Sequence, residues 1–168
     1  MIRCKNCLKE LSANTEACGN CGALVHPSPV VYFGVPMAYL TALCLLTLGI
    51  YQIYWFYKNW AAVKKAKGIR GIYPFWRALF AALFCWSLFK RIRNEAGTYG
   101  YKHQKSVRIA AFLFISSHVG LLILDELMRI TPLPSPTFLL LVFLSLQIIA
   151  LLIAQRAIEF HNKHAIAD

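Results

Sequence analysis

Long stretches without a charged side chain constrain the fold of this sequence more than any other feature. Residues 27–57 contain no Asp, Glu, Lys or Arg, and further apolar runs cover residues 78–89, 109–124 and 130–155. As one helix the first run would be about 46 Å long, which exceeds a hydrocarbon core of about 30 Å. The apolar fraction is 58%, above the roughly 45–50% of soluble domains. We therefore expect these runs to lie in a membrane.

The four runs differ in whether they can cross a bilayer. Pro36 and Gly49 are possible breaks within the first run. The second run has twelve residues, too few to cross, and is predicted to be a re-entrant or interfacial helix. The third and fourth runs are long enough to cross. The prolines between residues 131 and 136 predict a tight reversal that makes these two runs an antiparallel pair.

Basic residues are concentrated in one part of the sequence. Of 18 Lys and Arg residues, twelve fall between Lys58 and Arg108, where Glu95 is the only acid. A nucleic-acid-binding stripe is one explanation, but the apolar residues 78–89 interrupt it, which favours basic loops beside membrane segments. We therefore expect anionic lipids, and not nucleic acid, as partners. The predicted headgroup contacts are Lys58, Lys64, Lys65, Lys67, Arg70, Lys90, Arg91 and Arg93.

Charge also predicts orientation, because Lys and Arg favour the cytoplasmic side of short loops. The connector 125–136 holds one Arg and two acids and is expected outside, which puts the C-terminus in the cytosol. The chain opens with polar sequence and no secretory signal, so its first residues are expected in the cytosol too. A single crossing by residues 27–57 would then leave five positive charges between Lys58 and Arg70 outside. Either this run returns at Gly49 or the N-terminus is exported, and we expect the return.

Two Cys-x-x-Cys pairs, Cys4 with Cys7 and Cys18 with Cys21, are the strongest chemical signal. Each pair contributes two sulfur ligands, and the two pairs together form a tetrahedral four-sulfur site that suits one Zn²⁺ ion. Iron in the same cage and two disulfides are alternatives, and a cytosolic location argues against the disulfides. Four thiolate ligands leave no position for a catalytic water, so we expect one structural zinc ion.

Two resemblances agree with this reading. Residues 2–23 resemble the zinc-ribbon module that opens many bacterial membrane proteins, in which the cysteines of two CxxCG knuckles are the ligands. By this resemblance the four cysteines bind the ion, and Leu8 stands where the family usually has Gly. Residues 47–60 (TLGIYQIYWFYKNW), with 74–77 and 87–90, resemble an uncharacterised family of small bacterial inner-membrane proteins. Neither resemblance supplies an activity, but together they imply the inner (cytoplasmic) membrane.

We therefore predict a chain in three parts. Residues 1–24 form a short β-type zinc ribbon, residues 25–33 a proline-marked linker, and residues 34–168 a helical membrane domain. The fold class is mainly α, with two to four transmembrane helices plus a re-entrant or interfacial amphipathic helix.

Several polar residues within or beside the apolar runs are further candidates. His118 and Gln147 form a possible intramembrane site across the predicted antiparallel pair. A neutral histidine that only hydrogen bonds a neighbouring helix is the equal alternative. His161 and His164 are expected in a solvated tail.

The function expected from these features is that of an adaptor, sensor or assembly module. The zinc ribbon would contact a protein partner, and the basic stretch would contact anionic lipid. A transport component with a polar path at His118 and Gln147 is one alternative. A lipid-modifying enzyme that uses His118, Asp125 and Glu126 is another. Established nucleophile, metalloprotease and phosphate-loop motifs are missing from the sequence, so we do not expect an enzyme.

Overall fold

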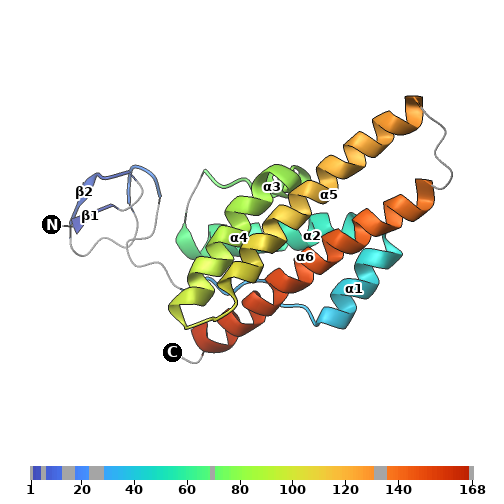
Figure 1. The fold of residues 1–168 in the computed structure, drawn as a ribbon. Coiled ribbons are helices and arrows are strands. Elements are labelled where there is room, and N and C mark those ends of the chain that lie inside the picture. Colours follow the sequence, from blue (N-terminus) through green and yellow to red (C-terminus); the bar gives the residue numbers. More distant parts are fainter. Residues whose placement is uncertain are drawn as a thin grey trace.

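The computed structural model is mainly helical and begins with a small two-stranded sheet (Figure 1). It describes residues 2–4, 7–12, 18–22, 29–68, 71–130 and 136–166. Strands β1 (Ile2–Arg3) and β2 (Glu10–Leu11) pair antiparallel. The described helices are α1 (Met37–Leu46), α2 (Ile50–Lys67), α3 (Pro74–Leu79), α4 (Ala81–Thr98), α5 (Gln104–Ile130) and α6 (Pro136–Ala165).

Helices α5 and α6 form a long pair that extends beyond the other helices (Figure 1). Both are long and apolar enough to cross a membrane, over Gln104–Arg129 and Thr137–Ala165. Only 33% of the apolar window of each helix is buried within the protein, whereas a helix in the core of a soluble protein is hydrophobic all round and mostly buried. The reversal predicted between the two helices falls on residues 131–135, outside the described residues.

The first apolar run is broken where its Pro and Gly predict. Helix α1 begins after Pro36 and ends at Leu46, and α2 begins after Gly49. Between them Leu48 and Gly49 both have positive φ angles, 48° and 92°. The Gly49 amide donates a hydrogen bond to the Cys44 carbonyl at 2.8 Å. This left-handed turn reverses the chain, so that α2 leads back toward the end from which α1 started (Figure 1).

Hydrogen bonds at the base of this helical hairpin bring its two ends together. The Phe33 amide, before α1, donates to Oδ1 of Asn59 in α2 at 3.1 Å. Tyr32 is held to α6 by two bonds with Asn162: the Tyr32 amide donates to Oδ1 at 3.0 Å, and the Tyr32 carbonyl accepts from Nδ2 at 2.8 Å. Both ends of the hairpin therefore lie near the C-terminal end of α6.

The tip of the hairpin lies against the N-terminal half of α6. A Cβ added at Gly49 would stand 3.3 Å from Leu144 Cδ1, so the turn packs closely on that helix. Residues 33–59 thus leave the C-terminal end of α6, reach its N-terminal half and return. The two ends of this segment therefore lie at the same level along α6.

The second apolar run was predicted to form one short re-entrant or interfacial helix, but it contributes to two helices. It is divided at Phe80 between α3 and α4, and α4 continues beyond the apolar residues to Thr98. The apolar run marked only part of the helix, because Lys, Arg, Glu and Ala in the following stretch are good helix formers. Helix α4 packs on α5, where the ring centroids of Trp86 and Phe112 are 4.9 Å apart.

A cluster of aromatic rings forms the centre of the core, where α2, α4 and α5 meet. The Phe56 ring lies 6.1 Å from Phe89 and 5.1 Å from Phe114, and Trp55 packs edge-on against Phe56 at 5.2 Å. All four side chains are buried. Aromatic pairs of this kind contribute roughly 0.5–1.5 kcal/mol beyond the area they bury, so the cluster ties the hairpin to the long helices.

We predict that Gly49→Ala lowers the free energy of unfolding by about 1–2 kcal/mol, because a side chain at a φ of 92° is strained. Thermal unfolding of the purified protein in detergent measures the change. The matched control is Gly71→Ala, where an added Cβ meets nothing within 4 Å and should change stability by less than about 0.5 kcal/mol. Equal effects of the two substitutions would contradict a tight turn at Gly49.

Candidate metal centre and charged surface

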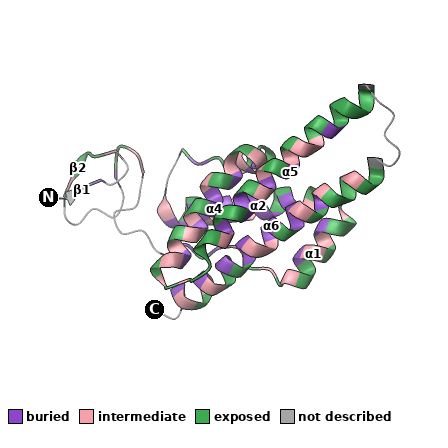
Figure 2. Ribbon diagram, viewed as in Figure 1, coloured by how far each residue is buried: buried purple, intermediate pink, exposed green. Residues whose placement is uncertain are grey.

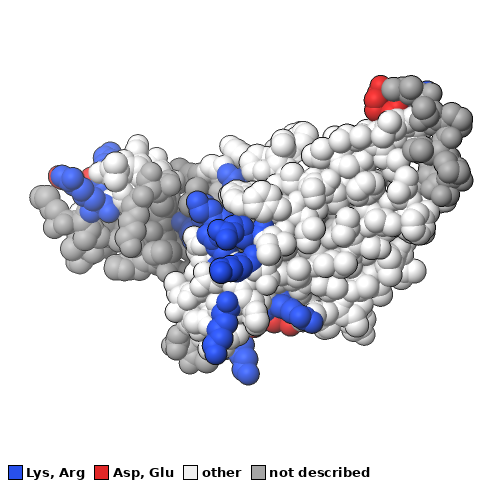
Figure 3. Space-filling view, viewed as in Figure 1, with Lys and Arg blue, Asp and Glu red and all other residues white. Residues whose placement is uncertain are grey.

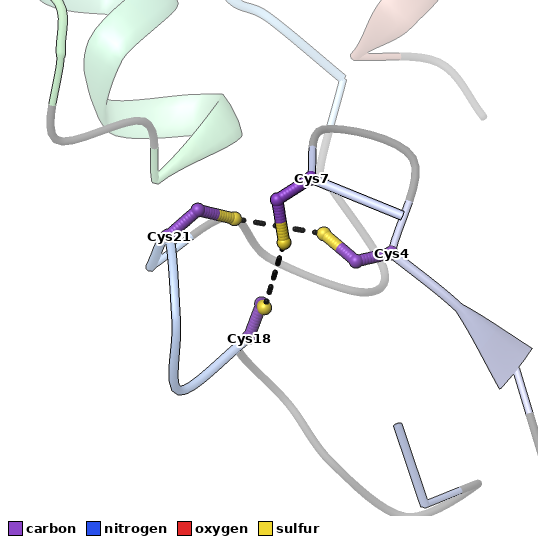
Figure 4. Close-up of side chains that lie close together, drawn as sticks. All are labelled: Cys4, Cys7, Cys18 and Cys21. Atoms are coloured by element: carbon purple, nitrogen blue, oxygen red, sulfur yellow. Dashed lines mark hydrogen bonds between the residues drawn. The ribbon is translucent and has the colours of Figure 1, made fainter. Parts of the chain in front are cut away.

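The four cysteines predicted as ligands come together in one cluster (Figure 4). All four Sγ atoms lie within 4.8 Å of one another, and the separations of Cys4 from Cys21 and of Cys7 from Cys18 are both 3.5 Å. A tetrahedral ion with bonds of about 2.3 Å to sulfur needs sulfur separations of about 3.8 Å, whereas a disulfide bond is about 2.05 Å long. All four cysteines are free, so the cluster can hold a metal ion.

Each cysteine pair is followed by the same kind of backbone turn. The Leu8 amide donates to the Cys4 carbonyl at 2.9 Å, and the Gly22 amide donates to the Cys18 carbonyl at 2.7 Å. Leu8 and Gly22 follow their pairs at the same place, and their φ angles are 60° and 71°. Glycine adopts this conformation freely, but it costs a residue with a Cβ roughly 1–2 kcal/mol. Leu8 is therefore a strained residue in the first knuckle.

Among the described residues of the N-terminal module, the cysteines make up nearly the whole core. Two of the cysteines are buried and two are half-buried, and Leu11 is the other apolar residue that packs on them among those described. The ion pair of Arg3 with Glu10 is 3.5 Å long and largely exposed, and exposed pairs contribute about 0–1 kcal/mol. A bound metal ion would therefore supply most of the free energy that folds this module.

Charge is separated along the length of the helical region (Figure 3). Basic side chains gather over α4 and the start of α5, and an acidic group lies beside other basic side chains at the lower edge of this view. Acidic side chains lie at the far end of α5, where Asp125 and Glu126 pair with Arg129. The surface between these two ends is uncharged. Arg70 lies outside the described residues. Of the other predicted headgroup contacts apart from Lys67, three are exposed (Lys64, Lys65, Lys90) and three are half-buried (Lys58, Arg91, Arg93).

Lys67 is engaged within the protein rather than available to lipid. Its Nζ lies 2.7 Å from Glu95 Oε1, and the Tyr32 hydroxyl donates to Glu95 Oε2 at 2.8 Å. Burial raises the pKa of Tyr32 well above its ordinary value, and the neighbouring Glu95 carboxylate raises it further. The sequence could not show this pairing, because Lys67 and Glu95 are brought together only by the packing of α2 on α4.

Aromatic rings accompany the basic residues on the surface. The Lys58 Nζ lies 5.5 Å from the ring centroid of Phe33 and 5.7 Å from that of Tyr54. Tyr and Trp side chains of this kind are typical of the headgroup level of a bilayer. The exposed aromatic residues on α2 and around α3 are Tyr54, Tyr57, Tyr73, Phe75, Trp76 and Phe80.

The uncharged surface beyond these rings is apolar and largely exposed (Figure 2). It includes the hairpin tip and the outer faces of α5 and α6. Soluble monomers rarely expose apolar patches larger than a few hundred Å², so this surface is suited to contact with lipid. Its exposed members include Leu46, Leu48, Ile50, Phe112, Leu122, Ile123, Phe138 and Leu141.

His118 and Gln147, the predicted intramembrane pair, lie in contact. Gln147 Nε2 is 3.4 Å from His118 Nδ1, and Gln147 Oε1 accepts a bond from Gln52 Nε2 at 3.0 Å. The shorter contact of His118 Nδ1 is with the Phe114 carbonyl at 2.9 Å, which requires the ring hydrogen on Nδ1. The cluster joins α2, α5 and α6, and its two glutamines are almost fully buried.

Further buried polar contacts continue toward the C-terminal end of α6. Trp55 Nε1 donates to Gln155 Oε1 at 2.9 Å. His161 Nε2 and the Val30 carbonyl are 2.8 Å apart, so this nitrogen carries the hydrogen. We use the term polar seam for the α6 residues that make these contacts, which are Gln147, Gln155, His161 and Asn162.

Most of the polar seam was missed by reasoning from the sequence. The available signal was the presence of isolated amides, Gln52 and Gln155, beside or within apolar runs. The expectation of a solvated tail at His161 and His164 was wrong. His161 is only 2% exposed, because the chain before α1 packs over it, and His164 is half-buried against the Phe160 ring at 4.3 Å.

The residues suggested for a lipid-modifying enzyme do not form one site. Asp125 and Glu126 follow His118 by about two turns of α5, or roughly 10 Å along the helix. Both carboxylates are exposed and lie within 4.0 Å of Arg129 nitrogens, at 3.0 Å and 3.9 Å. They are placed as charged groups at the end of a helix, away from the half-buried His118.

Comparison with protein-family models, with curated proteins and with solved structures gave no match. The function is therefore inferred from the sequence and geometry of the chain.

We predict that Leu8→Gly tightens metal binding by about five- to thirtyfold, because it removes roughly 1–2 kcal/mol of backbone strain from a module that folds with its metal. Gly22→Leu places the same strain in the second knuckle and should weaken binding by a similar factor. Competition between the full-length protein and a chromophoric chelator, with Co²⁺ as the probe, measures both. Unchanged affinity in both variants would show that the left-handed positions do not limit folding.

Proposed function

We propose that the protein is a membrane-embedded adaptor that displays a structural zinc module on the cytoplasmic side of a bacterial inner membrane. The observation that carries this proposal is a cluster of four sulfurs joined to a region of exposed apolar helix. An ion with four thiolate ligands has no open position for a substrate or a water molecule. The module would therefore contribute a surface for recognition rather than a reaction.

Zinc is the ion that this set of donors favours. A closed tetrahedral cage of four thiolates is typical of structural zinc, although iron binds the same ligands. In the proposed role Cys4, Cys7, Cys18 and Cys21 hold the ion as thiolates. They are best preserved in a reducing compartment.

The distribution of charge supports a cytoplasmic location for the basic end. The base of the hairpin and the C-terminal end of α6 lie together, and Lys64 and Lys65 follow the base on α2. A membrane placed around the uncharged surface would leave these lysines and the C-terminus on one side. Asp125 and Glu126 would lie on the other side. The N-terminal module precedes the base of the hairpin and would share the cytoplasmic side.

A protein partner is the ligand that best fits the exposed surface of the N-terminal module. Leu8 is 75% exposed and is held in a strained backbone conformation by the first knuckle. Strands β1 and β2 contact each other and no described helix. An exposed apolar side chain on a rigid loop is suited to recognition by another protein.

A transport function is a second candidate because the polar cluster lies within apolar helices. The side-chain amides of Gln52 and Gln147 bond to each other, and the His118 ring bonds to its own helix. These groups use much of their hydrogen-bonding capacity internally, which favours a role in holding helices together over a role in a hydrated path.

We predict one zinc ion per chain in the purified protein. Elemental analysis should give about one Zn, and the double variant Cys4→Ser, Cys21→Ser should lose it because two thiolates cannot close the cage. Cys44→Ser is the matched control and should keep the metal, since Cys44 is buried in α1 away from the cluster. Iron in place of zinc, or no metal in the parent protein, would refute the zinc centre.

We also predict that both ends of the chain lie in the cytosol. A reporter that is active only in the cytosol, fused separately to each terminus, should be active in both fusions, because the hairpin returns and α5 and α6 cross as a pair. Activity at the C-terminus alone would mean that the first apolar run crosses completely and that the metal module is exported.

A further inference from the structure

One face of α4 changes from apolar to basic along its length. Residues three or four positions apart share a helix face, and the outer stripe of α4 consists of Leu83, Trp86, Lys90 and Arg93. Leu83 is 76% exposed and Trp86 is 38% exposed. The stripe therefore runs from an apolar surface through an aromatic ring into two cations.

The facing part of α5 changes from basic to apolar along the chain. Arg108 comes four residues before Phe112, which is 59% exposed. The Phe112 and Trp86 rings pack edge to face, with centroids 4.9 Å apart. Because the two helices run in opposite directions, their apolar ends meet on one side of this ring pair and their basic ends meet on the other.

A cleft lies between the two stripes at the level of this change. The cleft is shallow: its volume is about 10 Å³, room for roughly one water molecule. Its lining residues are Trp86, Phe89, Lys90, Arg93, Arg108 and Ala111. An anion is therefore not enclosed by the cleft and would rest on its cationic rim, with its remaining atoms outside.

The charge of the cleft is positive and uncompensated by its own lining. Three lining residues are cationic and none is acidic. Glu95, the acid nearest in sequence, is engaged by Lys67 and Tyr32. The Arg93 guanidinium donates to Asn94 Oδ1 at 3.0 Å and 3.3 Å, which holds it in place and leaves its other hydrogens for an anion.

We propose that this cleft is a binding site for the phosphate group of an anionic glycerophospholipid. The phosphate contacts Lys90, Arg93 and Arg108, and the acyl chains lie along the Trp86–Phe112 ring pair and Leu83. The apolar side of the ring pair is what selects a lipid over a free phosphate compound. The inference rests on the proposed location in a membrane, and it assigns to one cleft the lipid contact that the sequence distributes over many basic residues.

Native mass spectrometry of the full-length protein in detergent, with added phosphatidylglycerol, tests the proposal. The variant Lys90→Gln, Arg93→Gln, Arg108→Gln should bind this lipid at least about tenfold more weakly, since three phosphate contacts are lost. The charge-matched control is Lys9→Gln, Lys102→Gln, Lys163→Gln, which removes three exposed cations outside the cleft and outside the predicted headgroup contacts, and it should lower affinity by less than about threefold. The single variant Lys90→Gln changes an exposed residue and should show an intermediate loss without affecting folding.

Three results would overturn the site. They are equal losses in the two triple variants, equal binding of phosphatidylcholine by the parent protein, and full displacement of the lipid by glycerol 3-phosphate at equal concentration. Incorporation of the parent protein into neutral lipid nanodiscs separates this proposal from the general one. If the parent protein enters neutral nanodiscs and the two triple variants lose equal lipid affinity, the cleft is not a lipid site but the membrane location stands. If the parent protein does not enter nanodiscs, neither the lipid site nor the membrane location stands.

Discussion

The hydrogen bonds that fasten the α1–α2 hairpin to α6 are the interaction on which the rest of the structure depends. Within lipid, apolar contact alone gives a hairpin little reason to stay against other helices, because lipid solvates its apolar faces equally well. Direct bonds hold it at three levels: Gln52 to Gln147 near the tip, Trp55 to Gln155 in the middle, and Tyr32 to Asn162 at the base. A buried polar group that loses its partner costs about 1–3 kcal/mol, so the polar seam fixes how deep the hairpin reaches and where it returns.

The return of the hairpin determines the polarity of the whole molecule. With both ends of residues 33–59 at one level, Lys64 and Lys65 lie toward the base of the hairpin and the C-terminal end of α6, away from Asp125 and Glu126 at the other end of α5. The cleft between α4 and α5 lies where basic and apolar side chains meet, since Lys90, Arg93 and Arg108 line it beside Trp86 and Phe89. In the proposed role, the metal module and the lipid site would both serve the cytoplasmic face, as expected of an adaptor that organises events at that surface.

Much of this arrangement follows from local sequence, and the remainder depends on packing between distant residues. The apolar runs predicted α5 and α6, the Pro and Gly predicted the breaks around α1, and the spacing of the cysteines predicted the sulfur cluster. The length of α4 was not predictable from apolarity, because its basic residues continue the helix. The partners of Lys67, Gln155 and His161 lie between 28 and 131 positions away, and no local pattern specifies such pairs. Leu8 shows the intermediate case: the resemblance marked it as standing where the family usually has Gly, and the structure gives it a positive φ of 60°.

Labelling of single introduced cysteines with a membrane-impermeant maleimide tests the return of the hairpin most directly. Val31→Cys lies before the hairpin, Lys65→Cys lies beyond it, and Glu126→Cys lies at the far end of α5; all three positions are exposed. The parent protein measures the background from its own six cysteines, of which Cys44 and Cys85 are fully buried and Cys7 and Cys21 are half-buried in the sulfur cluster. We expect Val31→Cys and Lys65→Cys to react only from the cytoplasmic side and Glu126→Cys only from the opposite side. Reaction of Val31→Cys and Lys65→Cys from opposite sides would show that the first apolar run crosses the membrane completely, and would contradict the return.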